Sequence, residues 1–127
     1  MRAIRSRGNR STEWRLRAKL MGRGIRGWEL HPRNVFGVPD FFFPAERLAV
    51  FVDGCFWHSC PRCGHMPKTN ADYWRLKIAR NRQRDRTVSR GLRKSGCTVV
   101  RFWECEVRAS LDRCANRISA SLLCSRR

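Results

Sequence analysis

Two periods of hydrophobic and polar residues alternate along this chain, one typical of helices and one typical of strands. In the first periodic segment, residues 11–22, apolar side chains recur at helical spacing. The side chains predicted to share its buried face are Trp14, Leu16, Ala18, Leu20 and Met21. Ser11-Thr12 offers a hydroxyl cap and Gly22 or Gly24 offers a stop, so the pattern predicts a helix between these positions.

Four short apolar runs are typical of β-strands. Residues 28–31 form the first run, which Pro32 ends. Residues 41–43 and 48–52 are separated by a polar turn that contains proline, so they predict a hairpin of two paired strands. Residues 97–103 form the last run, which we expect to be a further core strand.

A long helix is predicted from about residue 71 to residue 94, with Thr69-Asn70 as its cap and Gly96 closing it. Its sparse apolar positions are Trp74, Ile78, Val88 and Leu92. The basic residues that cover the rest include Arg75, Lys77, Arg80, Arg82, Arg84, Arg86 and Arg90. A cationic helix face of this kind is usually just exposed to solvent. Here almost no acidic residues neutralise the basic ones, which favours contact with phosphate. A last helix over residues 112–123 is expected to cover one face of a sheet.

The charge balance indicates a polyanionic partner. The 127 residues, which we expect to form a single domain, carry 28 Lys and Arg against 10 Asp and Glu, a net charge of +18. The positive charges repel one another, and a nucleic acid bound to the surface would neutralise them. A membrane surface is the weaker alternative, since the chain shows no lipidation signal or basic amphipathic anchor. Residues 1–10, with four arginines, are expected to form a mobile basic N-terminal arm that orders along a groove.

The lack of a long apolar run and of a signal peptide predicts a cytosolic protein. The chain contains no run of 18 or more apolar residues, so no membrane span is predicted. The N-terminus also lacks the apolar core of a signal peptide. Seven cysteines in a cytosolic chain point to metal binding and reduced thiols instead of a disulfide framework. Cys114 and Cys124 fall in the last helix, where we interpret them as small apolar residues.

Two aspartates stand at the ends of the predicted hairpin. Asp40 precedes its first strand and Asp53 follows its second, so strand pairing brings the two carboxylates towards the same sheet edge. Two hard oxygen ligands with room for water and phosphate are what a Mg²⁺ site needs. Taken singly, each acid is also explained by a turn, with Asp40 as its cap and Asp53 opening an Asp-Gly turn.

A cysteine-rich loop follows the hairpin. Its three cysteines, spaced as C-x4-C-x2-C, are Cys55, Cys60 and Cys63. This spacing is within the range by which one loop wraps a tetrahedral Zn²⁺, and a fourth ligand comes from elsewhere. Cys105 is our first choice for it, although His58 and His65 are also in range. Pro61 and the lack of apolar periodicity argue against the alternative, a set of buried, reduced cysteines.

The hexapeptide Asp-Gly-Cys-Phe-Trp-His at 53–58 forms a specific motif when it is considered together with several short elements elsewhere in the chain. The other matching elements are Pro39-Asp40, Tyr73-Trp74, Asn81, Arg84-Asp85 and Trp103-Glu104-Cys105. Together these residues resemble the Vsr very-short-patch-repair DNA mismatch endonucleases, over about residues 1–107. The resemblance implies a restriction-endonuclease-like α/β fold, in which helices flank a small central mixed β-sheet and a structural zinc stabilises a loop.

The resemblance also implies an activity: Mg²⁺-dependent nicking of one DNA strand next to a G:T mismatch, the very short patch repair of deaminated 5-methylcytosine. On this basis Asp40 is the central Mg²⁺ ligand, Asp53 is a second ligand or an orienting acid, and the Val52 carbonyl completes the shell. The resemblance places His58 at the scissile phosphate as general acid or base and Glu13 among the active-site acids.

Mismatch recognition has a physical requirement of its own. A G:T pair stacks poorly and deforms cheaply, so flat apolar rings that wedge into the duplex favour it over a matched pair. The wedge candidates are Phe56, Trp57 and Trp74, for which core packing is the alternative. Arg80 and Arg84, on the long helix, are predicted to contact DNA.

We expect a monomer in a bacterial-type cytoplasm, associated with the nucleoid, that binds double-stranded DNA with a G:T mismatch. Other mismatch-repair proteins are further candidate partners. Two competing hypotheses are a related nuclease that acts on other DNA structures and a zinc-stabilised DNA-binding module without catalysis. The non-catalytic module leaves Asp40, Asp53 and His58 unexplained.

Overall fold

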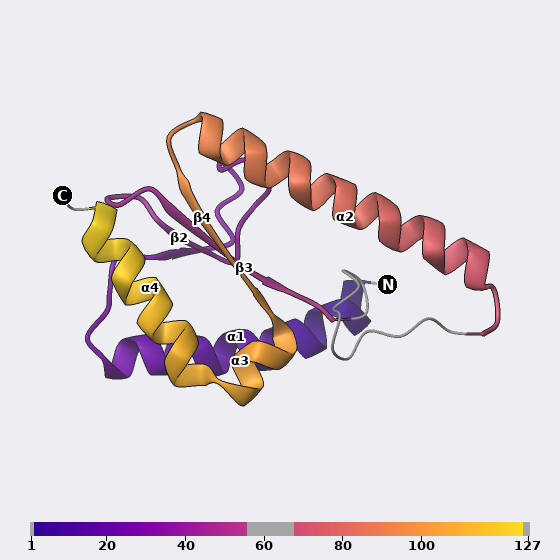
Figure 1. Ribbon diagram of the computed structural model, residues 1–127. Coiled ribbons are helices and arrows are strands. Elements are labelled where there is room, and N and C mark those ends of the chain that lie inside the picture. The colour runs from indigo at the N-terminus through magenta and orange to yellow at the C-terminus, as the bar shows by residue number, and fades with distance from the viewer. Residues whose placement is uncertain (1, 56–67, 126–127) are drawn as a thin grey trace.

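Four strands form one sheet in the computed structural model, which describes residues 2–55 and 68–125, without the side chains of residues 2–10 and 125. The strands, in their order across the sheet, are β1 (Glu29–Leu30), β2 (Phe41–Phe43), β3 (Leu48–Asp53) and β4 (Thr98–Trp103). The predicted hairpin is confirmed, because β2 pairs antiparallel with β3. β1 is antiparallel to β2, whereas β4 runs parallel to β3. The sheet is therefore mixed, as expected (Figure 1).

Helices cover both faces of this sheet. They are α1 (Arg2–Gly22), α2 (Ala71–Lys94), α3 (Glu104–Ala109) and α4 (Leu111–Ser125). Seen along the sheet, α1 and α4 lie on one side and α2 on the other (Figure 1). Strand β3 serves both layers, because successive side chains point to opposite faces. Val52 packs in the core with α1 and α4, while its neighbour Phe51 packs in the core beneath α2.

The start of α1 differs from the prediction. The helix begins at Arg2 and not at the cap predicted from Ser11-Thr12. Arginine, the commonest residue in this stretch, favours helices, which accounts for the earlier start. Thr12 has another use for its buried hydroxyl, which donates a hydrogen bond to Glu104 Oε2 at 3.3 Å and ties α1 to α3.

The buried face of α1 is narrower than predicted. Leu16 and Leu20, one turn apart, are fully buried against the sheet. The prediction is wrong for Trp14 and Met21, which are 58% and 61% exposed, and for Ala18, which is also exposed. Apolar residues at mixed spacings fit two adjacent helix faces, and only the face with Leu16 and Leu20 meets the sheet. The guanidinium of Arg17 lies 4.7 Å from the ring centre of Trp14, so this exposed indole is partly covered by its own helix.

Helix α2 has the predicted bounds. Asn70 occupies the N-cap position with φ 58, and the structure gives it no side-chain capping hydrogen bond, contrary to the prediction. Gly96 closes the helix as expected: its φ of 90 belongs to the left-handed region, and Cys97 N–H donates back to the Leu92 carbonyl at 2.9 Å. This tight end leads directly into β4.

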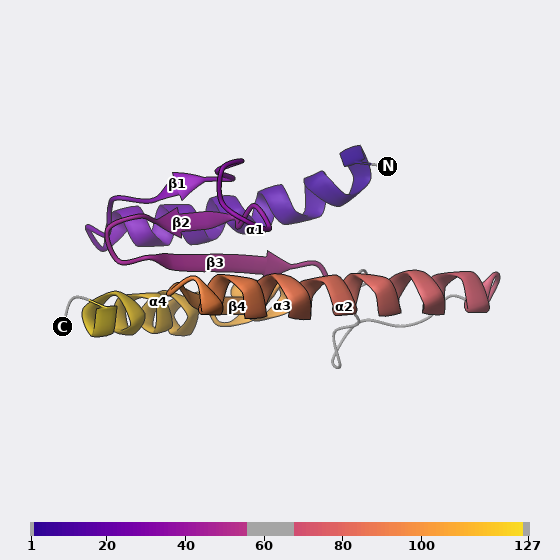
Figure 2. The same cartoon turned by 90° about the horizontal axis from the view of Figure 1, so that it is seen from above.

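The apolar stripe along α2 is as sparse as predicted. Ile78 and Leu92 are buried, and Trp74 and Val88 are half-buried. In two perpendicular views the N-terminal half of α2 projects past the end of the sheet (Figure 1; Figure 2). Because so little of α2 is buried, most of its basic side chains remain at the surface.

The C-terminal segment contains one more helix than predicted. Short α3 follows β4 directly and precedes α4, the helix expected over residues 112–123. Cys114 is buried in α4, and burial together with the Glu106 charge raises the pKa of its thiol to about 11. Cys124 is exposed, so α4 does not bury this small residue as it buries Cys114. None of the helices within residues 2–55 and 68–125 is long and apolar enough to cross a membrane.

Candidate active site

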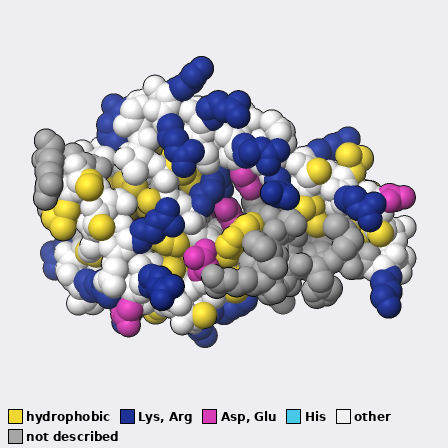
Figure 3. All heavy atoms as spheres, viewed as in Figure 1, with side chains coloured by type: hydrophobic (Ala, Val, Ile, Leu, Met, Phe, Trp, Pro, Cys, Tyr) yellow, Lys and Arg dark blue, Asp and Glu magenta, His cyan; other side chains and the backbone are white. Residues whose placement is uncertain are grey.

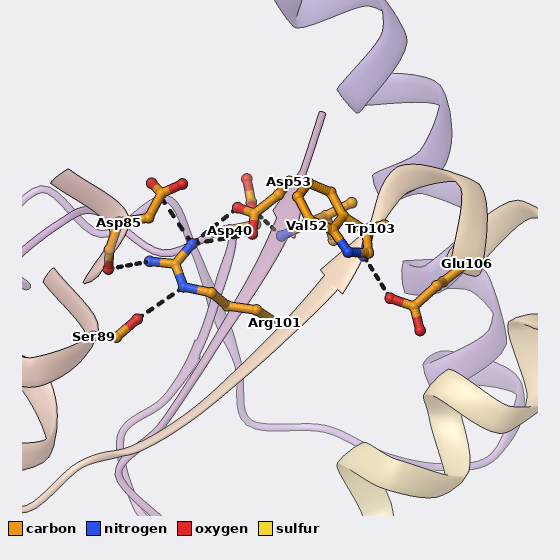
Figure 4. Close-up of polar contacts among 8 residues, drawn as sticks. All are labelled: Asp40, Val52, Asp53, Asp85, Ser89, Arg101, Trp103 and Glu106. Carbon is orange, nitrogen blue, oxygen red and sulfur yellow. Dashed lines mark hydrogen bonds and ion pairs between the residues drawn. The ribbon is translucent and has the colours of Figure 1, made fainter. Parts of the chain in front are cut away.

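Asp40 lies at the sheet end where β3 finishes. The residue immediately precedes β2, and the antiparallel register of β2 with β3, continued by one residue, puts it opposite Phe51 and next to Val52. Val52 N–H donates a hydrogen bond to Asp40 Oδ2 at 2.7 Å (Figure 4). With its side chain only 18% exposed, Asp40 is fixed by the backbone of the central strand and is not a loosely held turn residue.

Two further side chains converge on Asp40. Glu13 comes from α1, and His31 directly follows β1. His31 Nε2 lies 2.9 Å from Glu13 Oε1, and its Nδ1 lies 3.7 Å from Asp40 Oδ1. One potential ligand atom from each residue lies within 4.8 Å of the other two. Three separate segments of the chain thus place two carboxylates and one imidazole around one point. We call these three side chains, Glu13, His31 and Asp40, the Glu13 cluster.

The electrostatics of the Glu13 cluster favour a cation. The pKa of Asp40 is raised to about 8, mainly by burial and, in second place, by the hydrogen bond and negative charge of Glu13. The Val52 hydrogen bond and the nearby His31 oppose this rise. Two acids held this close cannot both ionise cheaply without a positive charge between them. Carboxylate oxygens are also the ligands that Mg²⁺ prefers, so the residues present fit a divalent cation.

Asp53 lies at the same sheet end but faces the other layer. It follows Val52 in β3, so its side chain points to the α2 side. Arg101 Nη1, from β4, contacts Asp53 Oδ1 at 2.9 Å and Oδ2 at 3.2 Å (Figure 4). The side chain of Asp53 is 12% exposed. The two aspartates therefore share a sheet end, as predicted, while Asp53 is held by an arginine that the prediction did not include.

Arg101 connects the sheet to α2. Its Nε donates to Ser89 Oγ at 2.8 Å and its Nη2 donates to the Asp85 carbonyl at 3.2 Å. The guanidinium also lies 4.1 Å from the ring centre of Phe51. Sequence reasoning missed this residue, although an arginine in the middle of an otherwise apolar strand was a usable signal, because a charge there needs partners.

The surface beside these residues is strongly basic. Figure 3 shows Lys and Arg side chains over much of the visible face, α2 included. A groove of about 680 Å³ between α2 and β4 is lined by Asp85, Arg86, Ser89, Arg90, Arg93, Lys94 and Arg101. Arg80 and Arg84 are exposed on α2, and Arg84 donates to Asn81 at 3.1 Å. Trp74 is half-buried and meets Tyr73 edge to face, with ring centres 5.1 Å apart.

The ends of β3 and β4 bring two of the predicted zinc ligands, Cys55 and Cys105, to the same end of the sheet. Asp53 pairs with Trp103, so Cys55 and Cys105 each come two residues after a paired position. Cys55 is buried, and Cys105 is partly buried in the first turn of α3. The remaining predicted side chains, Phe56, Trp57, His58, Cys60, Cys63 and His65, lie outside the described residues. The zinc ligand set stays a prediction.

Fold and site together define a class. A four-stranded mixed sheet flanked by helices, with clustered acids at one sheet end, is consistent with a nuclease fold. Residues 1–63 match the family model described as DNA mismatch endonuclease Vsr. The chain is 41% identical over 109 residues to the type II nicking enzyme V.XorIIP of Xanthomonas oryzae pv. oryzae, covering 84% of this chain and 78% of that enzyme.

Two further relatives agree. The DNA mismatch endonuclease Vsr of Escherichia coli is 36% identical over 110 residues, which cover 85% of this chain and 69% of that protein. The type II nicking enzyme V.NaeI of Lentzea aerocolonigenes is 53% identical over 68 residues, and the match spans 54% of this chain and 41% of that enzyme. The chain therefore belongs to the Vsr family. The names of the family and of these relatives indicate a DNA endonuclease.

Proposed function

We propose that this protein is a Mg²⁺-dependent endonuclease that nicks one strand of duplex DNA beside a G:T mismatch. The observation that carries the proposal is the Glu13 cluster: Glu13, His31 and Asp40 meet at one sheet end in a chain of the Vsr family. A net charge of +18 supports DNA as the partner. A DNA-binding module without catalysis would not need two carboxylates crowded together, since they repel each other and phosphate.

In this proposal Asp40 and Glu13 hold Mg²⁺, with the Val52 carbonyl as a further oxygen ligand. Bound there, the cation would neutralise charge that develops on the phosphate. Val52 N–H keeps Asp40 Oδ2 turned towards β3, which leaves Oδ1 on the side of His31. His58 serves as general acid or base at the scissile phosphate.

For Asp53, two roles were open: second metal ligand or orienting acid. Its contacts with Arg101 favour the orienting role, because a guanidinium already neutralises the carboxylate. Through Asp53, Arg101 fixes the end of β3 relative to α2. Asp53 then acts as a positioning residue for the segment that leads to Cys55 and His58.

Zinc and aromatic residues complete the proposal. Cys55, Cys60, Cys63 and Cys105 hold one structural Zn²⁺, with His65 as the alternative for one cysteine. Phe56, Trp57 and Trp74 wedge into the mismatched duplex. Arg80 and Arg84, exposed on α2, contact phosphates.

The test is a panel of end-labelled duplexes with G:T, other mismatches or matched pairs, incubated with and without Mg²⁺. We expect nicking of one strand at G:T only, and only with Mg²⁺. Equal nicking of matched DNA in a defined sequence would instead favour a nicking enzyme of different specificity; several relatives are named type II nicking enzymes. Binding without nicking of any duplex would refute the catalytic proposal.

A further inference from the structure

We infer that His31 is a side-chain ligand of the divalent cation, beside Glu13 and Asp40, and that its nitrogen shifts the preference of the site from Mg²⁺ towards Mn²⁺. This inference rests on the proposed function, which supplies the cation site. It adds a ligand that neither the sequence motifs nor the names of the relatives assign.

The position of the imidazole supports coordination. His31 lies between the two acids, with Nε2 2.9 Å from Glu13 Oε1 and Nδ1 3.7 Å from Asp40 Oδ1. One ligand atom from each of the three side chains fits within 4.8 Å of the others. Ligand atoms around one cation at bond lengths of about 2.1 Å lie no more than about 4.2 Å apart. Small side-chain adjustments therefore suffice to place all three on one ion.

The backbone at His31 is a second observation. Its φ of 47 lies in the left-handed region, where residues other than glycine are uncommon. The His31 N–H donates to the Asp40 carbonyl at 3.3 Å, which ties this turn to the start of β2. Backbone strain of this kind concentrates at functional sites. Here it aims a ring that is 49% solvent-exposed at two acids instead of leaving it in solvent.

Ligand chemistry gives the expected selectivity. Mg²⁺ prefers oxygen ligands and keeps much of its water, whereas imidazole suits transition metals better. A site with two carboxylates and one imidazole should bind Mn²⁺ more tightly than Mg²⁺. If His31 only orients Glu13 through their hydrogen bond, the bound ion has no nitrogen ligand, and replacing His31 should not change the preference between the two metals.

The variant His31→Asn separates the two roles. Asparagine tolerates a positive φ, so the backbone can keep its conformation, and its amide oxygen still offers a hard ligand. Isothermal titration of each metal should show Mn²⁺ affinity falling at least tenfold, on the order of the loss known for metal-site changes. Mg²⁺ affinity should change much less. The control is Glu29→Gln, which changes an exposed acidic residue of β1 and should alter neither affinity.

Pulsed electron paramagnetic resonance of the Mn²⁺-loaded protein gives a direct readout that does not depend on activity. We expect a ¹⁴N coupling from a directly bound nitrogen in the wild-type protein and its loss in His31→Asn. A bound Mn²⁺ without nitrogen coupling, or a coupling that survives His31→Asn, would overturn the inference.

A third variant, Asp40→Asn, makes the two possible failures distinguishable. If it abolishes Mn²⁺ binding while the wild-type ion shows no nitrogen coupling, the cation site of the proposed function stands and the role of His31 falls. If Mn²⁺ binds equally well to Asp40→Asn, the cation lies elsewhere, and both the proposed site and the role of His31 are wrong.

Discussion

Arg101 Nη1 lies 2.9 Å from Asp53 Oδ1, a contact that joins the end of β3 to the middle of β4 (Figure 4). Because Arg101 also donates to Ser89 and to the Asp85 carbonyl, the same guanidinium fixes α2. Asp53 was predicted as a second Mg²⁺ ligand or an orienting acid, from its place at the end of the hairpin and from the family resemblance. The contact gives it a structural task as well, and this task can be measured separately from nicking.

Breaking this ion pair should destabilise the fold. The side chains of Asp53 and Arg101 are only 12% and 22% exposed, so either one left alone loses a partner that water replaces poorly. In a double-mutant cycle with Asp53→Ala and Arg101→Ala, we expect a coupling free energy on the order of 1–3 kcal/mol from urea denaturation. The exposed pair Asp72 and Arg75 is the matched control and should show almost none. A coupling no larger than that of the control pair would contradict the assignment.

The pH dependence of stability should reveal the state of Asp40. The pKa of Asp40 is about 8 in the folded protein and 3.8 without the fold. Between these values the folded state holds a proton that the unfolded chain has released. The stability contributed by this group is therefore fully present below the unfolded pKa and is lost as the pH rises towards the folded pKa.

The measurement is urea denaturation in Mg²⁺-free buffer, for wild type and Asp40→Asn, between about pH 5 and pH 8. The free energy of unfolding of the wild type should fall with pH relative to that of the variant. Added Mg²⁺ should reduce this slope, since a bound cation replaces the proton. A difference that stays constant or rises with pH would show that Asp40 is already ionised in the free protein.

Zinc content should depend on the four predicted cysteines and on no other cysteine. We expect one Zn²⁺ per wild-type chain, and loss of both the metal and thermal stability in Cys105→Ser, because metal binding contributes directly to folding. Cys124→Ser is the matched control, since Cys124 is exposed and lies outside the set. Elemental analysis and thermal melting are the readouts. Zinc retained in Cys105→Ser would exclude Cys105 and favour His58 or His65 as the fourth ligand.

Trp57 should discriminate mismatched from matched DNA. If its ring enters the base stack, Trp57→Ala should reduce the preference for G:T over G:C by about 1–3 kcal/mol, the worth of one base–aromatic contact. The salt dependence of binding to matched DNA should not change, since that dependence comes from Lys and Arg contacts with phosphate. Salt titrations on both duplexes measure the two effects. Equal losses of affinity on both would mean that Trp57 contributes to general binding only.

Much of the fold was predictable because its signals are local. The hairpin around the turn after Phe43, the bounds of α2 and the stop at Gly96 follow from short-range apolar patterns and backbone preferences. The buried face of α1 was not predictable in the same way. Trp14 and Leu16 are both apolar, and only the position of the sheet decides that Leu16 is buried and Trp14 is not.

The candidate site was predicted in part for a similar reason. Asp40 and Asp53 flank a hairpin, so their shared sheet end follows from strand pairing. His31 and Arg101 were not assigned, because their roles depend on partners that are far away in the sequence. His31 meets Glu13 only when α1 packs against the sheet, and Arg101 meets Asp53 only when β4 aligns parallel to β3.

The central claim is that the Glu13 cluster cleaves DNA at a G:T mismatch. The most direct test is a nicking assay with Mg²⁺ on two duplexes that differ only in one G:T or G:C pair, with each strand labelled in turn. The wild-type protein should nick one strand of the G:T duplex and leave the G:C duplex intact. Asp40→Asn should bind the G:T duplex at least as tightly, because it removes a negative charge near phosphate, and should show no detectable nicking. Nicking by Asp40→Asn at the wild-type rate would contradict the account.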